Sequence, residues 1–334
     1  MTTKMSLPKA RIIGLGSYLP SKVLSNRDLE KIVDTTDEWI VTRTGMQERR
    51  IAAADEFPSD MGVMAAKQAI KAANLEENAI EMIIVATMSP DYISPSTANL
   101  IQAQLDAPQA ASMDINAACT GFIYALSIAN AYVKSGIYKY VLVIATEKMS
   151  AFIDYKDRST CVLFGDGAAA AVVAANGQGL SIDNVVLGSE GKLANLMMIP
   201  AGGSRHKASE ETVSSAQHYF KMSGSEVFKH AVRRMSQVSE ECLTQAGLQA
   251  DQIDWLVPHQ ANKRIIDALA KRFAIPEEKI YHTIRKYGNT SASSIAIALH
   301  ELTEKHPLAL GDHLLLTAFG VGLAWGAIVL TKCT

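Results

Sequence analysis

Cys119 is the residue whose surroundings best suit nucleophilic chemistry. It lies in the segment 114–122 (DINAACTGF), between a predicted short strand and a predicted amphipathic helix over 121–133. A thiol at a helix N-terminus lies close to the positive end of the backbone dipole and to free N–H groups, and both favour the reactive thiolate. The common alternative is burial as a small apolar side chain, which we expect for Cys161, Cys242 and Cys333. The position of Cys119 therefore favours a nucleophile.

Two polar residues of the second half of the chain are candidates to assist this thiol. His259 lies in the segment 257–262 (VPHQAN), directly after a predicted strand, and Asn289 lies in a glycine turn, 288–291 (GNTS), before another predicted helix. A single histidine or a turn asparagine ordinarily caps a helix or faces solvent. The functional interpretation therefore depends on whether the fold brings both residues to Cys119.

An internal duplication predicts that it does. The segment 73–84 is echoed by 246–257, with Leu248 following Leu75 by 173 residues. The same offset carries 141–144 onto 314–317, 12–13 onto 185–186 and Asn116 onto Asn289. We expect two related halves, 1–179 with Cys119 and 180–334 with His259 and Asn289. A pseudo-twofold axis between them would bring equivalent strand ends, and these three residues, to one central seam.

Each half alternates short Val/Ile/Leu-rich runs with amphipathic stretches, which is typical of α/β layers over a buried sheet. The uncharged segment 314–331 approaches the length of a membrane span. Glycines interrupt it, at 320, 322 and 326. We therefore expect two buried strands, 314–319 and 326–331, joined by a glycine turn rather than a membrane segment.

Composition narrows the class of protein. Of 334 residues, 48 % are hydrophobic and 20 % are charged, a balance that excludes a disordered or collagen-like chain. A net charge of −2 argues against a protein that coats nucleic acid. The four cysteines are far apart, as expected for thiols in a reducing compartment, and residues 1–11 lack the features of a secretory signal. We expect a cytoplasmic protein with no nucleic-acid or membrane partner.

The chemistry that fits these residues is covalent acyl transfer. The sequence lacks a complete dinucleotide fingerprint or phosphate loop, and His300, Glu301 and His306 are wrongly spaced for a helical zinc pair, so we expect no metal and no nicotinamide. A thiolate would take an acyl group from a thioester. The N–H donors of His259 and Asn289 would stabilise the enolate of a second substrate that loses carbon dioxide. Cysteine hydrolases use a similar set of residues, and spacing alone does not separate the two uses.

The chain resembles the β-ketoacyl-acyl-carrier-protein synthase III family, the condensing enzymes that start bacterial fatty acid synthesis. The likeness covers almost the whole chain and lies in ordered motifs: TTDEWI at 35–40 with RTG at 43–45, AACTGF at 117–122, FGDGA at 164–168, PHQAN at 258–262, YGNTS at 287–291 and AFG at 318–320. The resemblance implies an α/β thiolase-like fold, in which two duplicated halves form a five-layered αβαβα sandwich. It also implies a homodimer.

The resemblance implies a defined reaction. Cys119 would be acylated by acetyl-CoA or another short acyl-CoA, which is a substrate rather than a tightly bound cofactor. His259 and Asn289 would promote decarboxylation of malonyl-ACP, the malonyl-loaded acyl carrier protein, and the carbanion would attack the acyl-cysteine to give a 3-ketoacyl-ACP. The family likeness also assigns an oxyanion hole to the backbone N–H groups of Cys119 and Val321, a malonyl site to Phe319, and CoA binding to Thr35, Trp39, Arg43, Arg158, Ser225, Phe228 and Asn262. Trp39 and Arg158 would enclose the adenine.

Two further expectations concern specificity and docking. Ser94 stands before Pro95 where certain family members carry a bulky aromatic residue, so we expect a roomier primer pocket that admits longer or branched primers. The segment 263–286 carries seven basic and three acidic residues. Although such clusters are often solvated helix faces, this one would attract the acidic carrier protein, with Arg264 and then Lys263 as the docking contacts.

Alternative functions remain open at this point. A related condensing enzyme of secondary metabolism would use the same three residues on another acceptor. A cysteine acyl-thioester hydrolase would let water consume the acyl-cysteine when no malonyl donor is present. A catalytically silent acyl-binding protein would not require Cys119, His259 and Asn289 together.

Overall fold

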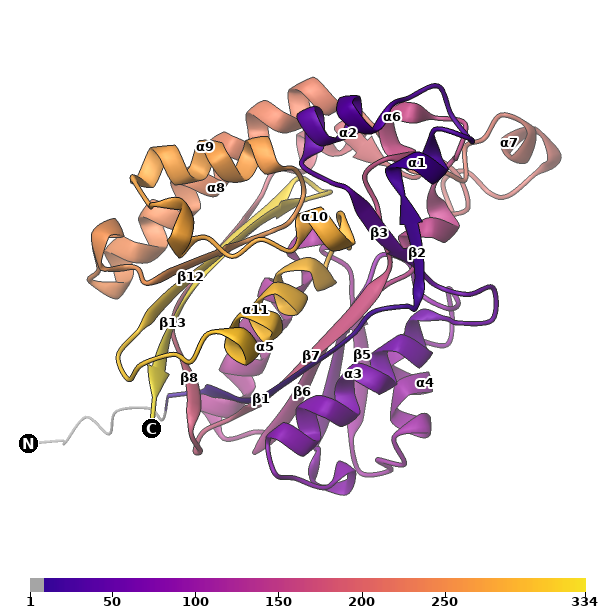
Figure 1. The fold of residues 1–334 in the computed structure, drawn as a ribbon. Helices are drawn as coiled ribbons and strands as arrows, with labels where there is room; N and C mark the ends of the chain where they lie inside the picture. Colours follow the sequence, from indigo (N-terminus) through magenta and orange to yellow (C-terminus); the bar gives the residue numbers. More distant parts are fainter. Residues whose placement is uncertain (1–8) are drawn as a thin grey trace, which may run out of the picture.

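The structure is a computed structural model that describes residues 9–334. Within them a mixed sheet of nine strands runs through the molecule in the order β11-β12-β13-β8-β1-β7-β6-β4-β5 (Figure 1). The strands are β1 (Arg11–Tyr18), β4 (Met82–Ala86), β5 (Ala111–Ile115), β6 (Tyr140–Glu147), β7 (Gly167–Ala174), β8 (Gly179–Ser189), β11 (Trp255–Pro258), β12 (His313–Gly320) and β13 (Ala324–Cys333).

Read from the centre outward, the first four strands on each side correspond, and β5 at the edge of the first half has no counterpart. Strands β8, β13, β12 and β11 of the second half mirror β1, β7, β6 and β4 of the first. β4 and β6 are parallel, as are β11 and β12, whereas the β1–β7 and β8–β13 pairs are antiparallel. The two halves of the sheet are joined where Arg11 and Ile12 pair with Ser181 and Leu180.

Helices cover both faces of each half-sheet and form three layers (Figure 1). α5 (Gly121–Ser135) and α11 (Ser293–Lys305) lie between the half-sheets. α3 (Pro58–Ala72) and α4 (Thr97–Gln104) cover the outer face of the first half, and α8 (Gly224–Ala246) and α9 (Lys263–Phe273) cover that of the second. Three layers of helices and two of strands confirm the five-layered sandwich expected from the sequence.

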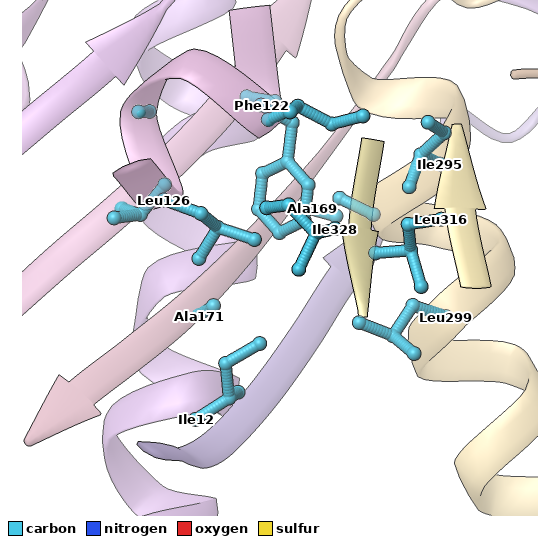
Figure 2. Close-up of a cluster of buried hydrophobic side chains, with 14 of the residues drawn as sticks. Ile12, Phe122, Leu126, Ala169, Ala171, Ile295, Leu299, Leu316 and Ile328 are labelled. Carbon is cyan, nitrogen blue, oxygen red and sulfur yellow. The ribbon is translucent and has the colours of Figure 1, made fainter. Parts of the chain in front are cut away.

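Alternating side chains divide the core among these layers. On β12, Leu314 and Leu316 face the central helices, whereas Leu315 faces α8 and α9. Figure 2 shows the central cluster, where Phe122 and Leu126 of α5 pack near Ile295 and Leu299 of α11. This cluster therefore contains side chains from both halves of the chain.

Small residues set the close approach of α3 to the sheet. β7 has the sequence GAAAAVVA and is buried along its whole length. On neighbouring β1, a Cβ atom at Gly14 would lie 2.2 Å from the carbonyl oxygen of Ala69 in α3. Only glycine fits there, so α3 packs directly onto the backbone of the sheet.

Shorter elements surround one end of the sandwich. They are the strand pairs β2 (Lys22–Ser25) with β3 (Glu48–Ile51) and β9 (Met197–Met198) with β10 (Lys221–Met222), and the helices α1 (Asn26–Leu29), α2 (Asp37–Thr44), α6 (Arg158–Cys161), α7 (Glu210–Ser214) and α10 (Ile284–Tyr287). α2 begins at Thr36, whose side chain accepts a hydrogen bond from the Trp39 N–H.

The 173-residue offset aligns β6 with β12 along their full length. It fails at the next strand, because residues 148–166 connect β6 to β7 whereas residues 321–323 connect β12 to β13. The boundary between halves at residues 179 and 180 stays a prediction.

The uncharged segment near the C-terminus forms β12 and β13, an antiparallel pair, as predicted. Among residues 9–334, no helix is both long and apolar enough to span a membrane. All four cysteines are free thiols.

Candidate active site

A cavity of about 650 Å³ opens between the central seam and the elements around α2 and α8. Cys119, His259 and Asn289 all line it, although they come from three distant segments of the chain. His259 and Asn289 are 2 % and 6 % exposed. Cys119 is partly exposed. The thiol, the imidazole and the carboxamide therefore face one shared space, in which the last two groups are shielded from water.

Cys119 lies between β5 and α5, as the sequence predicted. Residues Ala118–Thr120 form a short 3-10 turn that leads directly into α5. The side chain of Asn116 accepts a hydrogen bond from the Ala118 N–H at 3.3 Å, and Ala118 adopts a positive φ of 44°. This tight turn sets the nucleophile at the start of the helix.

Two features of the folded site oppose the thiolate expected at Cys119. Burial raises the pKa of this thiol to about 12, and the nearby carboxylate of Glu147 raises it further. A hydrogen bond from Sγ to the Ser291 hydroxyl, at 3.5 Å, only partly offsets these effects. Desolvation of the sulfur therefore opposes the thiolate that the helix start favours, and the ionisation state of Cys119 stays a prediction.

His259 follows the last residue of β11. Its backbone N–H donates to the Thr317 carbonyl at 2.8 Å, and its Nδ1 lies 2.6 Å from the hydroxyl oxygen of Ser294 in α11. Burial lowers the pKa of His259 to about 3, so the imidazole is neutral near pH 7. With Nδ1 bound to Ser294, the Nε2 edge is the one left to meet a ligand.

Asn289 lies in a turn that repeats the one before Cys119. Its Oδ1 accepts a hydrogen bond from the Ser291 N–H at 2.8 Å, and Ser291 adopts a positive φ of 51°. Under the offset of the duplication, Asn289 matches Asn116 and Ser291 matches Ala118. Because Oδ1 is held by the backbone, the Nδ2 donors of Asn289 remain for a ligand.

Gly320 ends β12 and packs against the nucleophile. A Cβ atom at this position would lie 2.9 Å from the Cys119 backbone nitrogen and 3.2 Å from its Cβ. The glycine thus allows the next residue, Val321, to lie on the cavity wall together with Phe319.

Sequence reasoning missed the contacts of Glu147 and Ser291. Glu147 is fully buried at the end of β6, and its Oε1 accepts a hydrogen bond from the Ser291 hydroxyl at 3.0 Å. Burial raises the pKa of this carboxyl to about 7. The 173-residue offset could have pointed to Glu147, because it aligns Glu147 with Gly320. A charged residue in one half thus corresponds to a glycine in the other.

Aromatic and basic side chains form another part of the cavity wall. Trp39, Arg43, Ser225, Phe228, Asn262 and Arg264 all line it. The Asn262 side chain also accepts from the Arg264 N–H, at 2.9 Å, and thereby caps α9. Arg264 is exposed and places its guanidinium 5.2 Å from the centre of the Phe228 ring.

Known proteins match this chain along its length. Residues 113–191 match the family model of 3-oxoacyl-[acyl-carrier-protein (ACP)] synthase III, and residues 243–332 match the model of its C-terminal part. A β-ketoacyl-[acyl-carrier-protein] synthase III from Chlamydia trachomatis serovar D is 56 % identical over 325 residues, which cover 97 % of this chain and 99 % of the relative. The chain belongs to the β-ketoacyl-[acyl-carrier-protein] synthase III family.

Solved structures agree with this assignment. The crystal structure of 3-oxoacyl-[acyl-carrier-protein] synthase III from Aquifex aeolicus has a TM-score of 0.89 and 49 % identity, covering 97 % of this chain and 100 % of that one. A priming β-ketosynthase of the R1128 polyketide biosynthetic pathway has a TM-score of 0.89 and 36 % identity, with 99 % of each chain covered. The thiolase-like fold and the acyltransferase class expected from the sequence are confirmed.

Four residues that the synthase III likeness placed in binding sites do not line the cavity: Thr35, Ser94, Arg158 and Lys263. Ser94 is exposed in the loop 91–96, beside Ile93, which is 92 % exposed. Ser94 therefore does not line the primer pocket of its own chain, and its role in primer choice stays a prediction.

Arg158 and Trp39 lie against each other rather than apart. The Arg158 guanidinium carbon is 4.9 Å from the centre of the Trp39 ring, and a guanidinium nitrogen donates to the Asp34 carbonyl at 2.9 Å. The space between them is closed in this state, so Arg158 must move away before an adenine can enter. Their enclosure of the adenine stays a prediction.

Ion pairs neutralise much of the basic segment 263–286. Lys263 contacts Asp267 at 2.5 Å, Arg272 contacts Glu240 at 2.7 Å and Lys279 contacts Asp254 at 3.8 Å. Among the described residues, Arg264 has no acidic partner within salt-bridge distance. Arg264 therefore carries an uncompensated charge at the cavity, as Arg43 does, whereas acidic side chains offset the charge of Lys263.

Two motif residues have structural roles. Gln260 is fully buried, donates to the Pro258 carbonyl at 2.7 Å, and accepts from the Thr283 N–H at 2.9 Å. Asp166 accepts hydrogen bonds from the Ala52 N–H and the Ser150 hydroxyl. These bonds fix the segments on which the cavity wall is built.

Proposed function

We propose that Cys119 takes an acyl group from a short acyl-CoA, with acetyl-CoA as the first choice, and that the acyl-enzyme condenses with malonyl-ACP. The family gives the chain its place as a condensing enzyme that initiates fatty acid synthesis. The observation that carries the residue assignments is that Cys119, His259 and Asn289 line one cavity. The products are a 3-ketoacyl-ACP, CoA and carbon dioxide.

In the first step, the sulfur of Cys119 attacks the thioester carbonyl and the bond to the CoA sulfur breaks. The backbone N–H groups of Cys119 and Val321 hold the oxyanion of the tetrahedral intermediate. The close packing of Gly320 on Cys119 supports this role, because it brings the two backbone segments together.

In the second step, His259 and Asn289 donate hydrogen bonds to the thioester oxygen of the malonyl group. Negative charge develops on that oxygen as carbon dioxide leaves, and two fixed N–H donors in a buried site stabilise it. The neutral state of His259 and the backbone contact of Asn289 Oδ1 support this role. Phe319 closes the malonyl site, and the carbanion then attacks the acyl group on Cys119.

The substrates bind through the residues around the cavity. Trp39, Arg43, Ser225, Phe228 and Asn262, with Thr35 and Arg158 beside them, bind the CoA portion. Arg264, assisted by Lys263, attracts the acidic carrier protein. The reaction needs the side chains of this protein and its two substrates, with no tightly bound cofactor.

We also propose that the protein is a cytoplasmic homodimer. Its free thiols fit a reducing compartment. The exposed apolar side chains of Tyr92 and Ile93 favour an intermolecular contact at the loop 91–96. Size-exclusion chromatography with light scattering should give twice the chain mass of 36.0 kDa, and a monomer at micromolar concentration would contradict the proposal.

Intact-mass analysis after mixing with acetyl-CoA tests the central step. The wild type and a Cys333→Ala control should gain one acetyl group, whereas Cys119→Ala should gain none. His259→Ala and Asn289→Ala should still be acylated but should form 3-ketoacyl-ACP about 10²-fold or more slowly, as expected when an oxyanion donor is removed. Acylation of Cys119→Ala would refute the assignment of the nucleophile.

The same experiment separates the alternatives. The structural likeness to the R1128 priming β-ketosynthase favours a condensing enzyme of secondary metabolism as the second candidate. That candidate would condense with another carrier protein and leave malonyl-ACP of fatty acid synthesis unused. A hydrolase would lose the acyl group to water without any malonyl donor.

A further inference from the structure

Glu147 is a buried acid that the steps above do not use. It is 0 % exposed, and it receives hydrogen bonds from the Ser89 hydroxyl at 2.5 Å, the Met88 N–H at 3.1 Å, the Ser89 N–H at 3.2 Å and the Thr87 hydroxyl at 3.2 Å. Each of these partners is neutral. A carboxylate buried without a cation is costly, so its presence beside a reactive thiol calls for an explanation.

A continuous chain of hydrogen bonds joins the nucleophile to this acid. The Cys119 thiol donates to the Ser291 hydroxyl at 3.5 Å, and the Ser291 hydroxyl donates to Oε1 of Glu147 at 3.0 Å. Both bonds point in the direction in which a proton would leave the sulfur. The other contacts of Glu147 keep its carboxylate aimed at Ser291.

The duplication shows that the backbone does not require these two side chains. The equivalent of Ser291 in the first half is Ala118, in the same positive-φ turn, and the equivalent of Glu147 in the second half is Gly320. The same local structures therefore form with no hydroxyl and no carboxylate. The hydroxyl of the second half and the carboxylate of the first half nevertheless meet beside Cys119.

We propose that Ser291 and Glu147 form a relay that removes the proton from Cys119 when the thiol attacks an acyl-CoA. The thiol proton passes to the Ser291 oxygen, and the hydroxyl proton of Ser291 passes to Glu147. The sulfur–carbonyl bond then forms and the bond to the CoA sulfur breaks. The Ser291 hydroxyl gives its proton to the departing CoA thiolate, and Glu147 returns a proton to the Ser291 oxygen. No net proton, electron or group is gained or lost by the relay.

His259 does not suit this task. Its Nδ1 is held by Ser294 at 2.6 Å, and burial lowers the pKa of the ring to about 3, so it resists taking a second proton. Burial instead raises the pKa of Glu147 to about 7, where the carboxyl accepts and returns protons readily. Glu147 thus acts in the acylation of Cys119, and His259 acts in the decarboxylation of malonyl-ACP.

Ser291→Ala is the decisive variant, because it cuts the relay and leaves the contacts of Glu147 with residues 87–89 in place. Ser293→Ala is the matched control, since the Ser293 hydroxyl is also buried but donates to the Thr290 carbonyl at 2.9 Å. Two rates are measured near pH 7: alkylation of Cys119 by iodoacetamide and single-turnover acylation by acetyl-CoA. We expect Ser291→Ala to lower both by about 10²-fold, typical of a lost general base, and Ser293→Ala to stay within twofold of wild type.

Rates for Ser291→Ala within threefold of wild type would overturn the relay. So would an equal loss in Ser293→Ala, or slow acylation with normal alkylation, which would show that Ser291 only positions the acyl-CoA. The inference takes its acyl donor from the function proposed above, but alkylation does not. Slowed alkylation in a protein that accepts no acyl-CoA would therefore support the relay and refute the proposed substrate.

The pH dependence of alkylation tests Glu147 itself. Among residues 9–334, Cys119 is the titratable side chain that faces it, and its remaining contacts are hydroxyl and backbone N–H groups. Only deprotonated Glu147 can accept a proton, so the wild-type rate should rise as the pH passes through about 7. In Glu147→Gln the inflection near pH 7 should disappear and leave only the steady increase with pH that ionisation of the thiol itself produces. The double variant with Ser291→Ala should be no slower than either single variant. An inflection retained near pH 7 in Glu147→Gln would overturn the assignment of Glu147.

Discussion

Ser294 decides which nitrogen of His259 meets the substrate. Its hydroxyl lies 2.6 Å from Nδ1, which reserves the Nε2–H for the developing enolate. We expect Ser294→Ala to lower the rate of malonyl-ACP decarboxylation about tenfold, the value of one lost hydrogen bond, because the tautomer and ring orientation are no longer fixed. Acylation of Cys119, measured by intact mass, should remain at the wild-type rate. Equal loss in both half-reactions would contradict this role.

The carboxyl of Glu147 links activity to stability. The folded protein holds a proton on this group up to about pH 7, whereas an unfolded glutamate loses it near pH 4.5. The contribution of Glu147 to the free energy of unfolding therefore falls as the pH rises from about 4.5 to 7, by roughly 3 kcal/mol at about 1.4 kcal/mol per unit.

Urea unfolding at pH 5 and pH 8 measures this effect. Wild type should lose more stability between the two values than Glu147→Gln does. His259, whose lowered pKa destabilises the folded protein below about pH 6.5, acts oppositely but equally in both proteins, so it cancels from the comparison. The same pH dependence in both proteins would show that Glu147 is ionised in the folded state throughout.

At the scale of elements, β12 must approach the 3-10 turn of Cys119 without a side chain between them. In Gly320→Ala, the new Cβ would meet the Cys119 backbone nitrogen at 2.9 Å. We expect a loss of about 1–3 kcal/mol in the free energy of unfolding, as for an overpacked core, and a larger loss of acylation rate, since the oxyanion donors are forced apart. Gly203→Ala, where a Cβ meets nothing within 4 Å, is the control and should change neither quantity.

Helix α9 presents a single uncompensated arginine at the cavity. Arg264→Glu should raise KM for malonyl-ACP about tenfold at low salt with kcat retained, because charge attraction acts on the encounter with the acidic partner. Lys271→Glu, on the same helix but absent from the cavity wall, should change KM less than twofold. Added salt should reduce the difference between Arg264→Glu and wild type. An unchanged KM for Arg264→Glu would remove this residue from the docking surface.

At the scale of the whole molecule, the two halves share one core although β1 and β8 pair over a short stretch at Arg11 and Ile12. α5 and α11 pack into the same central cluster (Figure 2). We expect one cooperative unfolding transition in urea, with coincident curves from tryptophan fluorescence and far-ultraviolet circular dichroism. Two separated transitions would show that the halves fold independently.

Local patterns predicted most of this architecture. The 173-residue offset predicted the mirrored strands, and the amphipathic pattern after Cys119 predicted its place at the start of a helix. Both predictions depend on short contiguous segments of the sequence. The desolvation that raises the pKa of the thiol escaped prediction, since it depends on how the folded seam packs around the sulfur. The partners of Lys263, Arg272 and Lys279 also escaped, because acids from elsewhere on the surface neutralise them. Glu147 carries no motif of its own and acquires a role only from what surrounds it.

The repeated turn has a consequence for the ancestry of the site. Ala292 occupies in the second half the position that Cys119 occupies in the first, so a symmetric precursor would have offered two equivalent niches. In the present chain, Ala292 stands in the second niche where Cys119 stands in the first. Glu147 faces the second niche in the place that Gly320 takes at the first. Negative charge there would repel a nascent oxyanion, so that niche is barred from the reaction that its twin performs. The two copies of the turn thus have different tasks: one carries the nucleophile, and the other supports it.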